Sequence, residues 1–159
     1  MCPPDRSLPP GGADARRADV AALYQELLLD HYRRPRNRGR LDDADAAPRK
    51  KNPLCGDVVE LYVRFDGDII QDVRFTGEGC AISQASASML TQQVKGKSTT
   101  QAAHVLDAFT RMIHGDETAA ADPALGDLRA LAGVSRIPVR HPCALLGWSA
   151  LADALASRG

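Results

Sequence analysis

Three cysteines and one aspartate are the residues of this chain best suited to chemistry. Cys55 and Asp57 lie in the segment NPLCGD, Cys80 lies in GEGCAIS, and Cys143 lies in VRHPCALLGW. Deprotonated thiols are soft ligands that suit zinc, copper(I) and the iron of iron–sulfur clusters. Three thiolates and one carboxylate complete a tetrahedral ligand set. The four residues therefore predict a thiolate-rich metal site.

The spacing of these cysteines indicates what kind of scaffold would hold a metal. Compact zinc fingers pair their ligands a few residues apart, whereas these ligands come from distant segments that only a folded domain can gather. Turn-forming residues such as Gly56, Gly79 and Pro142 stand beside the thiols, which favours loops and element ends over the core. Because a carboxylate exchanges more readily than a thiolate, we expect Asp57 to be the weakest ligand.

Length and composition predict one folded domain. The chain has 159 residues, 44% of them hydrophobic, which is enough for a core. Its 20 basic and 20 acidic side chains cancel, so the net charge favours neither nucleic acid nor a membrane as partner. No apolar stretch approaches a membrane span of about 18 residues, and no signal peptide is evident. We therefore expect a cytoplasmic protein with reduced thiols.

The N-terminal segment differs in composition from the rest of the chain. Residues 1–17 are rich in proline and glycine and poor in apolar side chains, which predicts a disordered tail. Residues 18–159 would then form the single domain. Cys2 falls in the tail, and we assign it no role.

Local patterns predict the elements that position the site. A helix is expected from near Asp19 to about Arg34. Alternating residues over 58–65 and 69–75, separated by the turn Asp-Gly-Asp, predict a β-hairpin. Cys55 and Asp57 would lie on one side of the chain where the first strand begins. The second strand would return the chain to the same end before Cys80.

Further helices are expected after the hairpin. They are predicted to run from Cys80 to Val94, from a capping box at 98–101 to near residue 115, from Asp122 through residue 131, and from Pro142 onward. Residues 134–143 are expected to be extended. Two thiols would then lie at helix starts, where the helix dipole favours the thiolate. The expected fold class is α+β, a small antiparallel sheet with helices packed on one face.

The three cysteine segments, in this order, resemble those of the U-type iron–sulfur cluster assembly proteins. This family contains IscU, the N-terminal domain of NifU, and SufU. The resemblance runs from about Tyr24 to the C-terminus. An added helical stretch from His114 to Gly133, and Pro142 immediately before Cys143, resemble the SufU type in particular.

The resemblance implies a zinc-dependent sulfurtransferase with a SufU/IscU-like fold. Zinc would be held by Cys55, Asp57, Cys80 and Cys143. Persulfide sulfur would come from a SufS-type cysteine desulfurase and pass on to downstream iron–sulfur assembly proteins. In the family mechanism a desulfurase histidine displaces the first cysteine, which makes Cys55 the sulfur acceptor. Arg140 would help to seat the partner or polarise the site.

Two other functions use the same residues. The thiolates could hold a [2Fe–2S] cluster on a scaffold for cluster assembly and transfer, since iron and zinc share this ligand chemistry. A non-catalytic zinc interaction domain is a further alternative, which the exchangeable Asp57 and the flanking glycines disfavour. His141 lies outside the family pattern, and we interpret it as a loop histidine.

Overall fold

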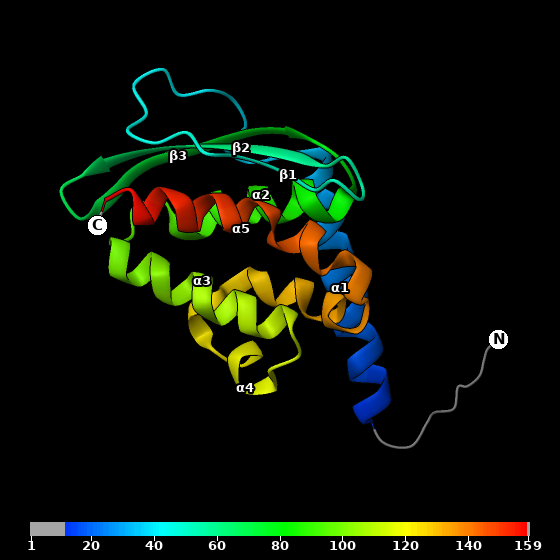
Figure 1. The fold of residues 1–159 in the computed structure, drawn as a ribbon. Helices are drawn as coiled ribbons and strands as arrows, with labels where there is room; N and C mark the ends of the chain where they lie inside the picture. Colours follow the sequence, from blue (N-terminus) through cyan, green and yellow to red (C-terminus); the bar gives the residue numbers. More distant parts are fainter. Residues whose placement is uncertain (1–11, 159) are drawn as a thin grey trace.

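The computed structural model describes residues 12–158, with side chains described from residue 22 onward. The elements are α1 (Gly12–Arg33), β1 (Arg49–Lys51), β2 (Val58–Asp66), β3 (Ile69–Glu78), α2 (Ala81–Val94), α3 (Thr99–Ile113), α4 (Glu117–Ala120), the 3₁₀ helices η1 (Pro123–Arg136) and η2 (Pro138–Arg140), and α5 (His141–Ala156). The strands form one antiparallel sheet in the order β1-β2-β3. Helices cover one face of it (Figure 1). The predicted α+β fold is confirmed.

The β2–β3 hairpin follows from residues of alternating character. Val59, Leu61 and Val63 point into the core and are fully buried, and Leu61 pairs with Phe75 across the hairpin. This alternation is the period of a strand with one buried face. The predicted hairpin is confirmed, but β3 continues beyond Phe75 to Glu78. The second strand therefore reaches the end of the sheet at which β2 begins.

Helix α2 lies at the centre of the molecule, against the sheet, α1 and α5. Its small residues allow close packing, since a Cβ added to Gly147 of α5 would lie only 3.5 Å from the Cα of Ala87. The hydroxyl of Ser86 donates to the carbonyl of Ala144 at 2.7 Å and accepts from the indole Nε1 of Trp148 at 3.1 Å. This buried serine thus joins α2 to α5 by hydrogen bonds as well as by contact.

A second layer of helices lies beneath α2 and α5, on the side away from the sheet (Figure 1). Trp148 of α5 stacks on Phe109 of α3, with ring centroids 4.6 Å apart. The predicted capping box of Ser98 and Gln101 opens α3, and Asp122 caps η1 as expected. These local signals fixed the helix starts because each cap satisfies backbone N–H groups that lack partners within the helix.

The first helix begins earlier than expected. We predicted a start near Asp19, whereas α1 begins at Gly12, so residues 12–17 of the expected tail are helical. Residues 1–11, which include Cys2, lie outside the described residues.

The expectation of an extended segment over residues 134–143 was wrong. The chain forms successive 3₁₀ turns instead, in which Ile137 N–H donates to the carbonyl of Val134 at 2.9 Å and Arg140 N–H donates to that of Ile137 at 2.8 Å. Pro138 begins η2, where its fixed φ suits a first helical position and its missing N–H costs no bond. This compact segment leads directly into α5.

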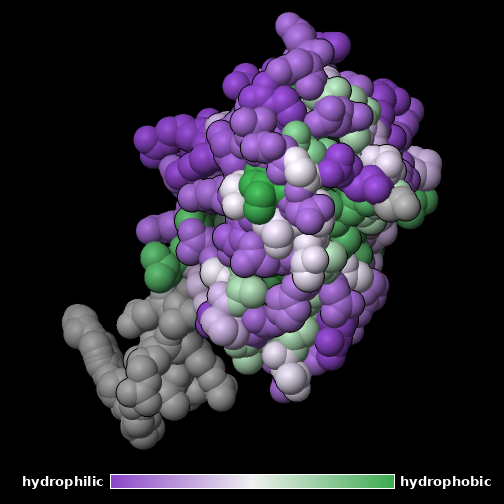
Figure 2. Space-filling view, turned by 90° about the vertical axis from the view of Figure 1, so that its left-hand side faces the viewer, coloured by the Kyte–Doolittle hydropathy of each residue, from purple (hydrophilic) through white to green (hydrophobic). Residues whose placement is uncertain are grey.

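The surface at the hairpin-turn end of the molecule is mostly hydrophilic. Figure 2 shows this end, with apolar side chains in small separate spots among polar ones. None of the helices in the described range has the length and apolar character needed to cross a membrane.

The buried His31 joins α1 to α2, and we expect this contact to be sensitive to acid. Its Nδ1 lies 2.8 Å from the hydroxyl of Ser88. Burial, and then the charge of Arg36, lower the pKa of His31 below its ordinary value of 6.5, against the opposing effects of Asp30 and Asp127. Since the unfolded chain then binds the proton more readily, the free energy of unfolding should fall as the pH drops below 6.5.

Replacing this histidine by His31→Gln should remove that pH dependence. The variant should be less stable than the parent at neutral pH and should lose less additional stability on acidification. Urea unfolding at pH 7, 6 and 5 would measure both effects. An equally steep loss of stability in parent and variant would show that another group is responsible.

Candidate metal centre

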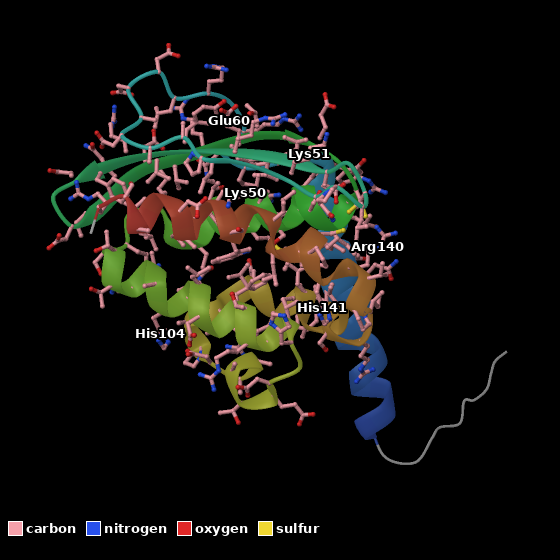
Figure 3. All side chains as sticks on the ribbon, in the orientation of Figure 1. Lys50, Lys51, Glu60, His104, Arg140 and His141 are labelled. Carbon is pink, nitrogen blue, oxygen red and sulfur yellow. The ribbon has the colours of Figure 1, made fainter. Side chains whose placement is uncertain are left out.

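The predicted ligands lie at the end of the sheet where β2 begins and β3 ends. Cys55 is in the loop before β2, and Asp57 directly precedes that strand. Cys80 is the N-cap residue of α2, and Cys143 is in the first turn of α5. Figure 3 shows Arg140 at this end of the molecule, beside a group of sulfur atoms. Segments far apart in the chain therefore meet at this end of the molecule.

The loop that carries Cys55 is closed by backbone hydrogen bonds. Asn52 N–H donates to the carbonyl of Asp57 at 2.8 Å, and Gly56 N–H donates to the carbonyl of Asn52 at 2.7 Å. Gly56 has φ +73°, in the left-handed region that glycine adopts without strain. Cys55 is held in this tight loop and is exposed to solvent.

The Asp57 carboxylate connects the sheet to the start of α2. It is only 1% exposed, and its Oδ1 accepts a hydrogen bond from the backbone N–H of Cys80 at 2.9 Å. Its Oδ2 lies 3.7 Å from the Cys80 sulfur. Gly79 has φ +148°, and a Cβ added there would lie 2.3 Å from Oδ1. Any side chain at position 79 would therefore overlap the Asp57 carboxylate, and glycine avoids this overlap.

Donor atoms of three of the four predicted ligands lie close enough together to share one ion. The sulfurs of Cys55 and Cys143 are 3.8 Å apart. With zinc–sulfur bonds of about 2.3 Å, tetrahedral geometry separates two sulfurs by about 3.8 Å and a sulfur from an oxygen by about 3.6 Å. The ligand atoms of Cys55, Asp57 and Cys143 all lie within 4.8 Å of one another, a set that does not include Cys80. Cys80 adjoins the set through its contact with Asp57.

Burial and charge act in opposite directions on the thiols. Burial, and then the interaction with Asp57, raise the pKa of the Cys143 thiol to about 12, while Arg140 acts to lower it. The guanidinium of Arg140 faces the cluster, and its own pKa is raised by Cys143 first and by Cys80 and Cys55 as well. A thiol with so high a pKa stays protonated at neutral pH even beside Arg140, whereas a coordinated metal ion would displace the proton. Arg140 alone therefore does not deprotonate Cys143, and the case for a metal ion rests on the grouping of the donor atoms.

One residue of the site was not anticipated from the sequence. The side-chain Nδ2 of Asn52 donates to the sulfur of Cys143 at 3.6 Å, and its Oδ1 accepts from Leu54 N–H at 3.2 Å. The pair Asn-Pro in the sequence signals only a turn. His141 is not the loop histidine that we expected, because it is the first residue of α5. Its side chain contacts the carbonyl of Ser135 at 3.0 Å and lies edge-on to the ring of His114.

Comparison with known proteins agrees with this geometry. Residues 23–157 match the family model of the NifU-like N-terminal domain. The chain belongs to this family. Its members include proteins that resemble the chain over most of their length, and the predicted resemblance to the U-type proteins is confirmed.

Three relatives in this family illustrate its range. The zinc-dependent sulfurtransferase SufU of Bacillus subtilis is 45% identical over 141 residues, which cover 87% of this chain and 93% of that protein. The iron–sulfur cluster assembly scaffold protein IscU of Streptococcus pyogenes is 44% identical over 133 residues, with coverage of 84% and 82%. The crystal structure of a putative scaffold for the SUF system of Fervidobacterium islandicum has a TM-score of 0.77 at 37% identity, with coverage of 84% and 97%.

Replacing Gly79 by alanine should weaken metal binding. The new methyl group would meet the Asp57 carboxylate, and displacing a group of this kind typically costs about tenfold or more in metal affinity. Gly96→Ala is a matched control, because Gly96 also has a positive φ but has open space around its Cβ position. Zinc competition with a chromogenic chelator would measure both affinities. Equal affinities in the two variants would contradict the role of Gly79.

Proposed function

We propose that this protein is a zinc-dependent sulfurtransferase of iron–sulfur cluster assembly, which accepts persulfide sulfur from a SufS-type cysteine desulfurase at Cys55. The observation that carries the proposal is an exposed Cys55 thiol 3.8 Å from the buried Cys143 thiol, in a ligand set whose spacing fits zinc. The similarity to a protein named zinc-dependent sulfurtransferase SufU supports it.

The donor residues divide into a buried part and an accessible part. Zinc would be held by Cys55, Asp57, Cys80 and Cys143, and when bound it would keep the thiols deprotonated and support the fold. Asp57 and Cys143 are buried and Cys80 is half-buried, whereas Cys55 is exposed. A sulfur atom offered by another protein can therefore reach Cys55 most directly.

Sulfur transfer to Cys55 is a thiol–persulfide exchange. The Cys55 sulfur attacks the outer sulfur of the persulfide on the desulfurase cysteine. A new sulfur–sulfur bond forms on Cys55, the bond in the donor persulfide breaks, and the electron pair leaves with the desulfurase thiolate. Atoms and electrons balance without an added oxidant. The guanidinium of Arg140, which faces these thiols, would offset the negative charge on the reacting sulfurs.

Exposed apolar side chains stand beside Cys55 and Arg140 in the sequence, and we call them the apolar collar. The collar consists of Leu54, Ile137 and Val139, which are 79%, 45% and 62% exposed. Leu54 precedes Cys55, and the other two are neighbours of Arg140 in η2 and at its cap. The opposite end of the molecule carries only small apolar spots (Figure 2). Exposed apolar side chains beside a nucleophile favour docking of a protein, as persulfide transfer from an enzyme requires.

Assembly of a [2Fe–2S] cluster is the second candidate function. Thiolates bind tetrahedral iron as well as zinc, and relatives named as IscU scaffold proteins are also similar to this chain. A purely structural zinc interaction domain fits less well, because it would gain nothing from an exposed ligand such as Cys55.

Metal analysis and desulfurase kinetics separate the two candidates. Protein purified without added metal should contain about one zinc per chain, show no visible chromophore, and increase the turnover of a SufS-type desulfurase. Bound iron with a sulfide-to-iron charge-transfer spectrum, and no effect on turnover, would instead identify a cluster scaffold.

Serine variants of neighbouring residues should distinguish chemistry from docking. Cys55→Ser should abolish stimulation of the desulfurase and the gain of one sulfur atom seen by mass spectrometry, while the domain stays folded. Leu54→Ser should raise the concentration needed for half-maximal stimulation severalfold and leave the maximum nearly unchanged, because it alters the apolar collar only. Cys2→Ser should behave as the parent. Full stimulation by Cys55→Ser would rule out the relay through Cys55.

A further inference from the structure

A single asparagine side chain links the loop that carries Cys55 to the start of α5. Asn52 is 4% exposed. Its Oδ1 accepts from the backbone N–H of Leu54, the residue before Cys55, at 3.2 Å. Its Nδ2 donates to the sulfur of Cys143 at 3.6 Å. We call this pair of contacts the Asn52 bridge.

Burial and backbone hydrogen bonds hold the Asn52 side chain in place. The backbone N–H and carbonyl of Asn52 also bond within the same loop, to Asp57 and Gly56, so the side chain has little freedom to turn away. A buried amide is costly when its donor or acceptor lacks a partner, and both ends of this amide have one. Serine or alanine at position 52 could not span the two segments.

We propose that Asn52 is a positioning residue that keeps the Cys55 loop seated against Cys143. The bridge uses the backbone of Leu54 and not the Cys55 side chain, so it would persist when the Cys55 sulfur is bonded elsewhere. On the proposed function, on which this consequence rests, Asn52 returns Cys55 to the same place after each sulfur transfer. The geometric part of the proposal needs no desulfurase.

The equilibrium between the two thiols and their disulfide measures this positioning directly. In protein freed of metal by a chelator, with Cys2 and Cys80 replaced by serine, oxidised glutathione would convert Cys55 and Cys143 to a disulfide and form two molecules of reduced glutathione. Alkylation and mass spectrometry at several ratios of reduced to oxidised glutathione give the equilibrium constant. That constant rises with the effective concentration of one thiol near the other.

Two variants and one control decide the outcome. Asn52→Ala removes both contacts, whereas Asn52→Ser keeps a hydroxyl that can accept from Leu54 N–H but cannot reach Cys143. Both should lower the equilibrium constant about five- to tenfold, as expected for a lost hydrogen bond. Gln93→Ala removes a hydrogen bond of 2.7 Å that the side-chain Nε2 of Gln93 donates to the carbonyl of Ala124, away from the thiols. This control should leave the equilibrium constant at the parent value.

Three results would overturn the proposal. They are a parental constant in Asn52→Ala, a parental constant in Asn52→Ser, and an equal loss in Gln93→Ala. The second would reduce the role of Asn52 to the turn alone, and the third would reduce it to general stability.

The absorption spectrum of the cobalt-substituted protein gives a second measurement if a metal-free variant fails to fold. A hydrogen bond to a thiolate withdraws electron density from sulfur. With Cys2 and Cys80 intact, Asn52→Ala and Asn52→Ser should both shift the thiolate-to-cobalt charge-transfer band to longer wavelength, and Gln93→Ala should not. An unshifted band in both Asn52 variants would overturn the contact with Cys143. Neither measurement involves sulfur transfer. The role of Asn52 can therefore be tested even if the protein proves not to be a sulfurtransferase.

Discussion

The close approach of α2 to the helices and strands around it is the constraint on which the site depends. Alanine and serine side chains let α2 pack against the sheet and α5. Gly147 brings the backbone of α5 so close to Ala87 that an added Cβ would be in van der Waals contact with it. This packing sets the distance between the starts of α2 and α5, which carry Cys80 and Cys143. Because protein interiors are close-packed, a larger residue in this interface would push the helices apart and change the distance between the thiols.

The Asp57 carboxylate adds an electrostatic condition to this packing. It is buried, yet it accepts a hydrogen bond from the N-terminal backbone of α2, where the helix dipole favours negative charge. The same group raises the pKa of the Cys143 thiol. Asp57 therefore stabilises the contact between the sheet and α2, but it also disfavours the thiolate form of Cys143. Arg140 offsets this effect only in part.

Sequence patterns predicted the parts of this molecule that short-range physics controls. Alternation gave the hairpin, and the cap residues Ser98 and Asp122 gave helix starts, because each of these signals acts within a few residues. The cysteine segments, through their residue types and turn-forming neighbours, indicated the cluster of Cys55, Asp57 and Cys143.

Sequence patterns missed features of two kinds. Some segments suit more than one backbone conformation, and some contacts join residues far apart in the chain. The 3₁₀ turns around Pro138 arise where a proline suits either an extended or a helical start. Composition suggested a tail where α1 in fact begins at Gly12. Asn52 could not be identified because its partner Cys143 is 91 positions away in the chain, and no local pattern encodes that distance.

The wide separation of the donor residues also makes the site a reporter of folding. Cys55 and Cys143 are 88 positions apart, so the unfolded chain pays a large loop-closure entropy to bring them together. A metal ion would bind such a set tightly only after the sheet, α2 and α5 have packed. Metal occupancy would then track the folded fraction of the population, and a core mutation that unfolds the chain would also release the metal.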